Sequence, residues 1–113
     1  MARPRLRRFF RHGLFPQLIA FEACVRLGSV TRAAEELSLA QPTVSGLLRK
    51  LSETVGEPVL RFRGGRVELT DAGADVEVLC EEVLESLGRF DARRRQRAAV
   101  GRPACPDGLQ FTP

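Results

Sequence analysis

The stretch SVTRAAEELSLAQPTVS, residues 29–45, decides how this chain folds. A helix is expected to begin near Ser29 or Thr31, because the side chains of Ser and Thr accept hydrogen bonds from unpaired N–H groups at helix starts. Residues 38–40 then form a tight corner, and Pro42 stands in the first turn of the next helix, where its missing N–H costs nothing. The stretch therefore predicts two helices joined by a three-residue turn.

Apolar residues recur at helical spacing on both sides of this turn. Upstream, a helix is expected from Phe15 to Leu27, ended by Gly28, since glycine readily adopts the left-handed conformation that closes many helices. Downstream, the helix that starts at Gln41 is expected to run to Gly56. The expected inner faces carry Leu18, Phe21 and Val25 in the first helix, Ala33, Ala34 and Leu37 in the second, and Val44, Leu47, Leu48 and Leu51 in the third.

The pattern of apolar residues changes from helical to alternating after Gly56. Residues 59–62 and 66–69 are typical of two short strands, and Gly64 and Gly65 lie between them. Two glycines between short apolar runs are a strong signal for a tight β-hairpin. The sequence therefore predicts a hairpin after the third helix.

A long last helix is expected over residues 70–97, capped by residues 70–71. Its apolar residues are spaced four, three, four and three apart, which is the heptad spacing of a packed helix pair. These residues are Val76, Cys80, Val83, Leu87 and Phe90, and they are expected to form the interface of a homodimer. Alternatively, the first half of this stripe packs on Phe15, Leu18 and Phe21 of the same chain.

The order of helix, helix, turn, helix, hairpin and helix is that of a winged helix-turn-helix, whose third helix fits the major groove of DNA. The expected fold class is mainly α, with a three-helix core and a two-stranded wing followed by a long dimerisation helix. The expected organisation is a basic leader at 1–13, a winged helix-turn-helix DNA-binding domain at 14–69, a linker or dimerisation helix at 70–97 and a disordered tail at 98–113.

Charge and composition narrow the class of function. A net charge of +4 and a pI near 9.7 weakly favour a polyanionic partner. Cys24, Cys80 and Cys105 lack the spacing of a zinc site, and His12 is the only histidine, so we expect no metal, no cofactor and no enzyme activity. No apolar run approaches the ~20 residues that cross a bilayer, so we expect a cytoplasmic protein without membrane contact.

The motif around the turn resembles the DNA-binding signature of LysR-type transcriptional regulators. The resemblance covers about residues 14–90 and is carried by Ser29–Ala34, Leu37 and Gln41–Ser45, followed at the family's spacing by Gly56, Leu69–Thr70 and Ala72–Gly73. It implies that the third helix reads duplex DNA, that the hairpin is the wing and that the last helix makes the dimer.

The resemblance also implies which side chains contact DNA. They are Thr31 and Arg32 in the second helix, Gln41, Pro42, Thr43, Ser45, Arg49 and Lys50 in the third, and Arg61, Arg63 and Arg66 in the wing. A glutamine such as Gln41 can pair with adenine through two hydrogen bonds, whereas arginines suit phosphates. Two alternatives stay open: Thr31 serves only as a helix cap, or Ser45 bonds back to its own helix.

Three positions depart from the family pattern. Gly46 stands where a long polar residue is usual, Ser52 replaces a usual glutamate, and Phe62 stands where arginine is typical. Glycine at position 46 also lowers helix propensity by roughly 1 kcal/mol relative to alanine. These departures are expected to change affinity and site preference but to leave the fold intact.

The expected function is sequence-specific binding of double-stranded DNA by a dimeric transcriptional regulator without a small-molecule effector domain in this chain. The alternative is a degenerate helix-turn-helix interaction module that pairs with and modulates a full-length regulator. The acidic first half of the last helix keeps this alternative open. Within the DNA-binding class, molybdate-responsive regulators have an N-terminal domain of the same architecture, but residues 41–45 favour the LysR type.

Overall fold

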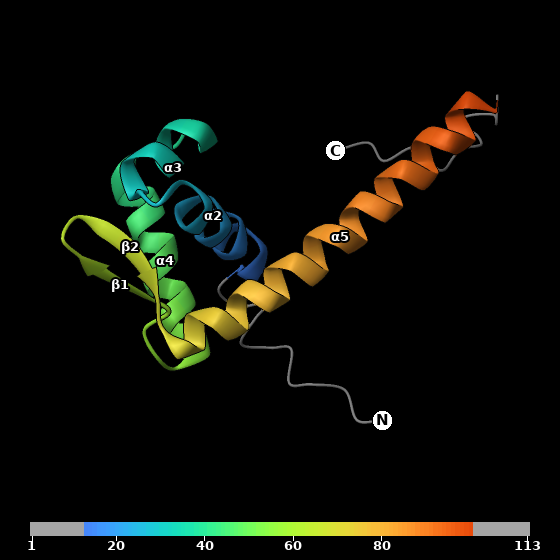
Figure 1. Cartoon of the computed structure of the whole chain (residues 1–113). Helices are drawn as coiled ribbons and strands as arrows, with labels where there is room; N and C mark the ends of the chain where they lie inside the picture. Colours follow the sequence, from blue (N-terminus) through green and yellow to red (C-terminus); the bar gives the residue numbers. More distant parts are fainter. Residues whose placement is uncertain (1–12, 101–113) are drawn as a thin grey trace, which may run out of the picture. The chain divides into compact units, whose positions relative to one another are not determined.

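The computed structural model describes residues 13–100, and Figure 1 shows the elements in their order along the chain. The helices are α2 (Leu14–Leu27), α3 (Val30–Leu37), α4 (Gln41–Val55) and α5 (Asp71–Ala99), and the strands are β1 (Leu60–Arg63) and β2 (Arg66–Leu69). The two strands form an antiparallel hairpin directly after the three-helix core. The expected fold class is confirmed, because the chain is mainly helical and carries a two-stranded wing.

The chain divides into two compact units, Met1–Cys80 and Glu81–Pro113. The first unit contains α2, α3, α4, both strands and the start of α5, and the second contains the rest of α5. The wing and the helix-turn-helix therefore belong to one compact unit.

Most of the expected leader at 1–13 and of the expected tail at 98–113 lies outside the described residues. α5 runs to Ala99, so the first two residues assigned to the tail are helical. Alanine is the best helix former, which explains why the helix continues past its expected end at residue 97.

The start of α3 is fixed by a side-chain cap. The Oγ of Ser29 accepts a hydrogen bond from the backbone N–H of Arg32 at 3.1 Å, while Ser29 itself has an extended backbone. Ser29 is therefore the N-cap of this helix. The alternative that Thr31 is the cap is wrong, because Thr31 lies inside the helix.

The end of α3 forms the corner before α4. Ser38 adopts a left-handed φ of 57°, and its N–H donates to the carbonyl of Glu35 at 3.2 Å. The N–H of Leu39 donates to the carbonyl of Ala34 at 2.9 Å. This pair of bonds is a Schellman motif, which ends a helix and reverses the chain within a few residues. The corner thus places α4 directly after α3.

The three helices enclose the core of the first unit, since α2 contacts both α3 and α4, and α3 contacts α4. Ala33 and Ala34 are buried, and their small side chains allow α3 to approach its neighbours closely. The other buried apolar residues of the three helices are Leu18, Ala20, Phe21, Ala23, Cys24, Val44, Leu48 and Leu51. Val25, Leu37 and Leu47, also expected on the inner faces, are only half-buried.

Hydrogen bonds tie the base of the wing to α4 and to the start of α5. The Oγ1 of Thr70 accepts from the N–H of Gly73 at 3.0 Å, as expected for a cap, and donates to the carbonyl of Pro58 at 2.6 Å. The Oγ of Ser52 accepts from the N–H of Val59 at 3.2 Å. A Cβ on Gly73 would lie 2.0 Å from the carbonyl oxygen of Val59, so this close approach requires glycine.

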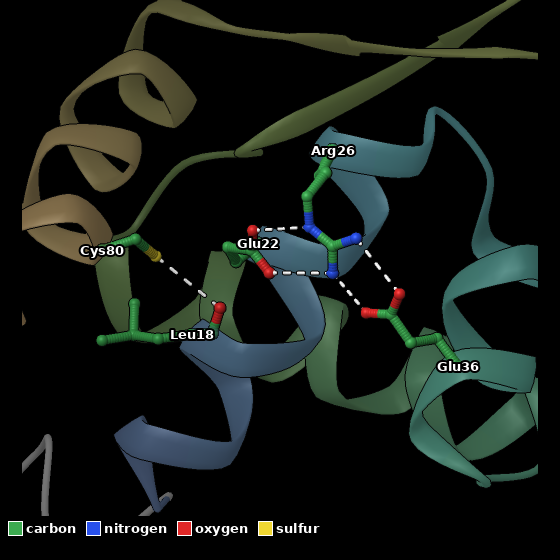
Figure 2. Close-up of polar contacts among 5 residues, drawn as sticks. All are labelled: Leu18, Glu22, Arg26, Glu36 and Cys80. Atoms are coloured by element: carbon green, nitrogen blue, oxygen red, sulfur yellow. Dashed lines mark hydrogen bonds and ion pairs between the residues drawn. The ribbon is translucent and has the colours of Figure 1, made fainter. Parts of the chain in front are cut away.

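The first two residues of the expected dimer stripe, Val76 and Cys80, are buried in the first unit. The thiol of Cys80 donates to the backbone carbonyl of Leu18 at 3.6 Å, as Figure 2 shows. Their burial supports the alternative expectation, in which the first half of the stripe packs within its own chain. Val76 and Cys80 are therefore core residues and are not free to contact a second copy.

Candidate nucleic-acid interface

α4 has one buried face and one exposed face. The buried face carries Val44, Leu48, Leu51 and Thr54. The exposed positions include all those expected to contact DNA: Gln41, Pro42, Thr43, Ser45, Arg49 and Lys50. Helix positions three or four apart share a face, so burial of the apolar residues fixes the polar ones toward solvent. A rigid helix with an exposed polar face has the size that the major groove of B-DNA admits.

The N-terminus of α4 has no side-chain cap. Its N-cap, Ala40, has no side-chain hydrogen bond to the helix, and Pro42 has no N–H to donate. The N–H groups of Thr43 and Val44 donate back to the carbonyl of Ala40, at 3.0 and 3.2 Å. The positive end of the helix dipole therefore lies beside exposed polar side chains, an arrangement that favours a phosphate nearby.

The start of α3 presents two further expected contacts. Thr31 and Arg32 are exposed in the first turn of the helix. Because Ser29 supplies the cap, the hydroxyl of Thr31 is not needed for that purpose. Both side chains are accordingly available to an external partner.

The two faces of the wing differ in character. In the hairpin register, Leu60 lies opposite Leu69 and Phe62 opposite Val67, which gives one apolar face. The other face carries Arg61, Arg63, Arg66 and Glu68. Gly64 and Gly65 form the turn with positive φ angles of 58° and 77°, the conformation that a tight two-residue hairpin requires. The expected basic residues of the wing thus share one face.

Charge at the tip of the wing is unbalanced. Arg63 lies directly opposite Arg66, and like charges in that position repel each other. Glu68 lies 3.8 Å from the guanidinium of Arg63, but both side chains are exposed, so this ion pair is weak. The tip of the wing therefore carries a net positive charge that is exposed to solvent.

An ion-pair cluster links α3 to α2 at the surface, as Figure 2 shows. Arg26 of α2 donates to Glu22 at 2.9 and 3.3 Å and to Glu36 of α3 at 3.1 Å, with a second, shorter bond to the same carboxylate. The hydrogen bonds from Arg26 lower the pKa of the Glu36 carboxyl, and those to Glu36 and Glu22 raise the pKa of Arg26. The sequence analysis missed this cluster, although the spacing of four between Glu22 and Arg26 is a usable signal.

The described cysteines are buried thiols and not part of the interface. Cys24 and Cys80 are both free, and burial raises the pKa of Cys24 to about 11. A thiol with so high a pKa stays protonated at neutral pH and is a poor nucleophile. Cys105 lies outside the described residues, and residues 13–100 contain no cluster of side chains that could hold a metal ion. Within the same residues, no helix has the length and apolar character to cross a membrane.

These features define a class of protein. A helix with an exposed polar face, held by two scaffold helices and followed by a basic hairpin, is a winged helix-turn-helix DNA-binding module. The model of the LysR family of bacterial regulatory helix-turn-helix proteins matches residues 15–74, which is more than half of the chain. The chain belongs to this family.

Curated relatives are transcriptional regulators. The chain is 40% identical over 80 residues to a RuBisCO operon transcriptional regulator of Acidithiobacillus ferrooxidans, covering 71% of this chain and 26% of that protein. It is 45% identical over 60 residues to the HTH-type transcriptional activator CmpR of Synechocystis, covering 53% of this chain and 20% of that protein. The chain thus matches only a fifth to about a quarter of the length of these relatives.

Solved structures of DNA complexes share the fold. The complex of the CbnR DNA-binding domain with DNA superposes with a TM-score of 0.65 at 31% identity, over 74% of this chain and 97% of that chain. The complex of the BenM DNA-binding domain with its catB site 1 DNA gives a TM-score of 0.67 at 26% identity, over 74% and 92%. Both are DNA-binding domains of about the extent of the described residues.

Proposed function

We propose that this chain binds duplex DNA sequence-specifically and regulates transcription as a dimer. The observation that carries the proposal is the exposed face of α4. Its polar residues are exposed to solvent, while the apolar residues of the same helix are buried in the core. Membership of the LysR family and the names of the curated relatives support the same function.

In this proposal Gln41, Thr43 and Ser45 contact base edges or adjacent phosphates. They occupy the first two turns of α4, and glutamine is suited to two hydrogen bonds with adenine. The positively charged side chains contact the backbone and set the register of the protein on the duplex. They are Arg32, Arg49, Lys50, Arg61, Arg63 and Arg66, while Thr31 and Pro42 complete the contact surface.

The proposed dimer forms through the second unit. Within that unit Val83 is half-buried, while Leu87 is 43% and Phe90 is 56% exposed. Val83, Leu87 and Phe90 follow one another at spacings of four and three, so they share one face of the helix. Burial of this face against a second copy would place two copies of α4 on one inverted-repeat site.

We propose that this chain acts in the cytoplasm, where its DNA target is found. Its role is to bind DNA, without catalysis and without a cofactor. The curated relatives are transcriptional regulators, which supports a role outside catalysis. A catalytic role would require a nucleophile, a base and an orienting group within reach of one another.

Titration of a labelled duplex at two salt concentrations tests the proposal. The cations of α4 and the wing release counterions when they bind phosphates, so affinity should fall with salt at a log–log slope of about −0.9 per phosphate neutralised. Absence of duplex binding even at low salt would contradict the proposal. That result would favour the alternative of an interaction module that pairs with a full-length regulator.

A further inference from the structure

A groove runs between α4 and the wing on the apolar side of the hairpin. Its volume is about 200 Å³ and it is lined by Ser45, Leu48, Arg49, Ser52, Val59, Leu60 and Phe62. Figure 1 shows the hairpin beside α4. The groove therefore lies between the two elements that are proposed to hold DNA, one in the major groove and the other next to it.

Phe62 is the unexplained residue of this groove. It lies on the same hairpin face as Leu60, which is half-buried, yet Phe62 is 62% exposed. An aromatic side chain that faces its own domain without being buried by it leaves a large apolar area exposed to water. Packing within the described chain therefore gives no reason for phenylalanine at this position.

The rims of the groove carry different chemistry from its floor. Leu48, Val59 and Leu60 give an apolar floor, and Phe62 forms one apolar rim. Ser45 and Arg49 are one helical turn apart on α4 and form a hydroxyl and guanidinium rim. The groove therefore suits a group that is apolar itself but bonded directly to an anion.

We propose that this groove takes one deoxyribose of the DNA backbone, with the ring of Phe62 against the sugar and Ser45 and Arg49 on the phosphate next to it. The inference rests on the proposed function, since it names a contact within the same complex. A backbone strand separates the major groove from the minor groove, so a strand must pass between a helix in one and a wing at the other. The arginines on the opposite face of the wing supply the charge that attracts this strand.

Such a contact adds affinity without adding charge. Replacing Phe62 with alanine removes apolar area that the sugar would cover, which should weaken binding by about fivefold to tenfold. The slope of log affinity against log salt should stay as in the wild type, because no phosphate contact is lost. Phe62→Arg should instead make the slope steeper by about 0.9, since one more phosphate would be neutralised.

Hydroxyl-radical footprinting of a selected duplex tests the sugar contact directly, because these radicals cleave DNA by attacking exposed sugars. Wild type should protect a nucleotide that Phe62→Ala leaves open, with Phe62→Leu protecting it in part. Phe15→Ala is the matched control, since Phe15 is 48% exposed on α2, outside the proposed contacts, and should leave both affinity and footprint unchanged. Equal thermal unfolding of the variants would show that the fold is intact.

Three results would overturn the inference. One is a footprint and affinity of Phe62→Ala equal to the wild type, and another is a shallower salt slope for this variant. The third is loss of affinity without loss of sugar protection, which would mean that Phe62 makes another contact, for example as a wedge between bases. All three presuppose that wild type binds duplex DNA; failure of the wild type to bind would instead refute the proposed function.

Discussion

Gly46 and Gly73 both lie in helices, but the space around them differs. A Cβ on Gly46 would meet only the guanidinium of Arg49, at 3.9 Å, which is ordinary contact with the end of a flexible side chain. A Cβ on Gly73 would overlap the carbonyl of Val59, which belongs to the backbone and cannot move alone. Glycine is thus required at 73, whereas at 46 it only costs helix stability.

Gly46→Ala should raise the free energy of unfolding by about 0.5–1 kcal/mol, because alanine has less backbone freedom to lose in a helix. Urea denaturation followed by circular dichroism measures this change. Gly73→Ala is the matched control and should lower the same quantity by about 1–3 kcal/mol, since the start of α5 must shift away from the wing. Equal effects of the two substitutions would contradict this explanation.

Gln41 and Arg66 should differ in what their loss does to DNA binding. Gln41→Ala should weaken the preferred site by about 1–3 kcal/mol and leave binding to random duplex nearly unchanged, because glutamine reads a base edge. Arg66→Ala should weaken both and reduce the salt slope by about 0.9, because arginine at the wing tip neutralises a phosphate. Competition binding with preferred and random duplexes measures both. Uniform loss in the Gln41 variant would exclude it as a base reader.

Among the elements, α3 has both of its ends fixed by local hydrogen bonds. It is short, its start is capped by Ser29, and its end is closed by the bonds of Ser38 and Leu39. The cluster of Arg26 with Glu36 adds an external link to α2. Because α4 follows α3 directly after the corner, the Arg26–Glu36 pair also affects how the exposed face of α4 is oriented.

The Arg26–Glu36 link should make stability depend on pH on the acid side. The folded state lowers the pKa of Glu36 from its ordinary value of 4.5, so its contribution is present above about that pH and is lost as the pH falls below it. Glu36→Gln should therefore flatten the loss of stability below this pH. Thermal unfolding across the acid range measures the effect, which should be small because the pair is exposed. Glu53→Gln is the control, because Glu53 is exposed on α4 and forms no ion pair within residues 13–100.

The hairpin and the helix-turn-helix could be predicted because each depends on local residues. Gly64 and Gly65 tolerate the left-handed conformation that other residues adopt only at a cost, and both adopt the positive φ that this tight turn requires. The position of Arg26 against Glu36 could not be predicted, because it depends on how two helices pack. The same holds for the buried contact of Thr54 with Gln17, at 3.5 Å, between residues far apart in the sequence.

Some features of the candidate site could likewise be predicted from local residues, and others depend on packing. The positions exposed on α4 follow from helix periodicity, so Gln41 and Ser45 could be placed on its outer face from the sequence. The heptad stripe was misleading at Val76 and Cys80, because periodicity shows that a face is covered but not by which chain. The groove beside Phe62 depends on the distance between a helix and a hairpin, which no local pattern contains.

At the scale of the whole molecule, the most uneven distribution of charge is in the second unit. The acidic residues Glu81, Glu82 and Glu85 come first, and after Arg89 and Asp91 follow Arg93, Arg94, Arg95 and Arg97. Ion pairs within the helix involve Arg89 and Arg95, and among the described residues none involves Arg93, Arg94 or Arg97. Two copies paired in opposite directions would bring the acidic part of one helix beside the arginines of the other. Complementary charges flanking an apolar seam are a known determinant of helix pairing and orientation.

The proposed dimer predicts the effect of a charge in the seam. Leu87→Asp should bury an unpaired carboxylate between the two copies and shift the protein to monomer, with weaker binding to an inverted-repeat site. Val78→Asp is the matched control, because Val78 is also exposed on α5, at 56%, but lies outside the stripe. Sedimentation at several concentrations measures the masses, and circular dichroism checks the fold. A wild-type monomer at micromolar concentration, or a dimer that survives Leu87→Asp, would show that the second unit does not make the dimer.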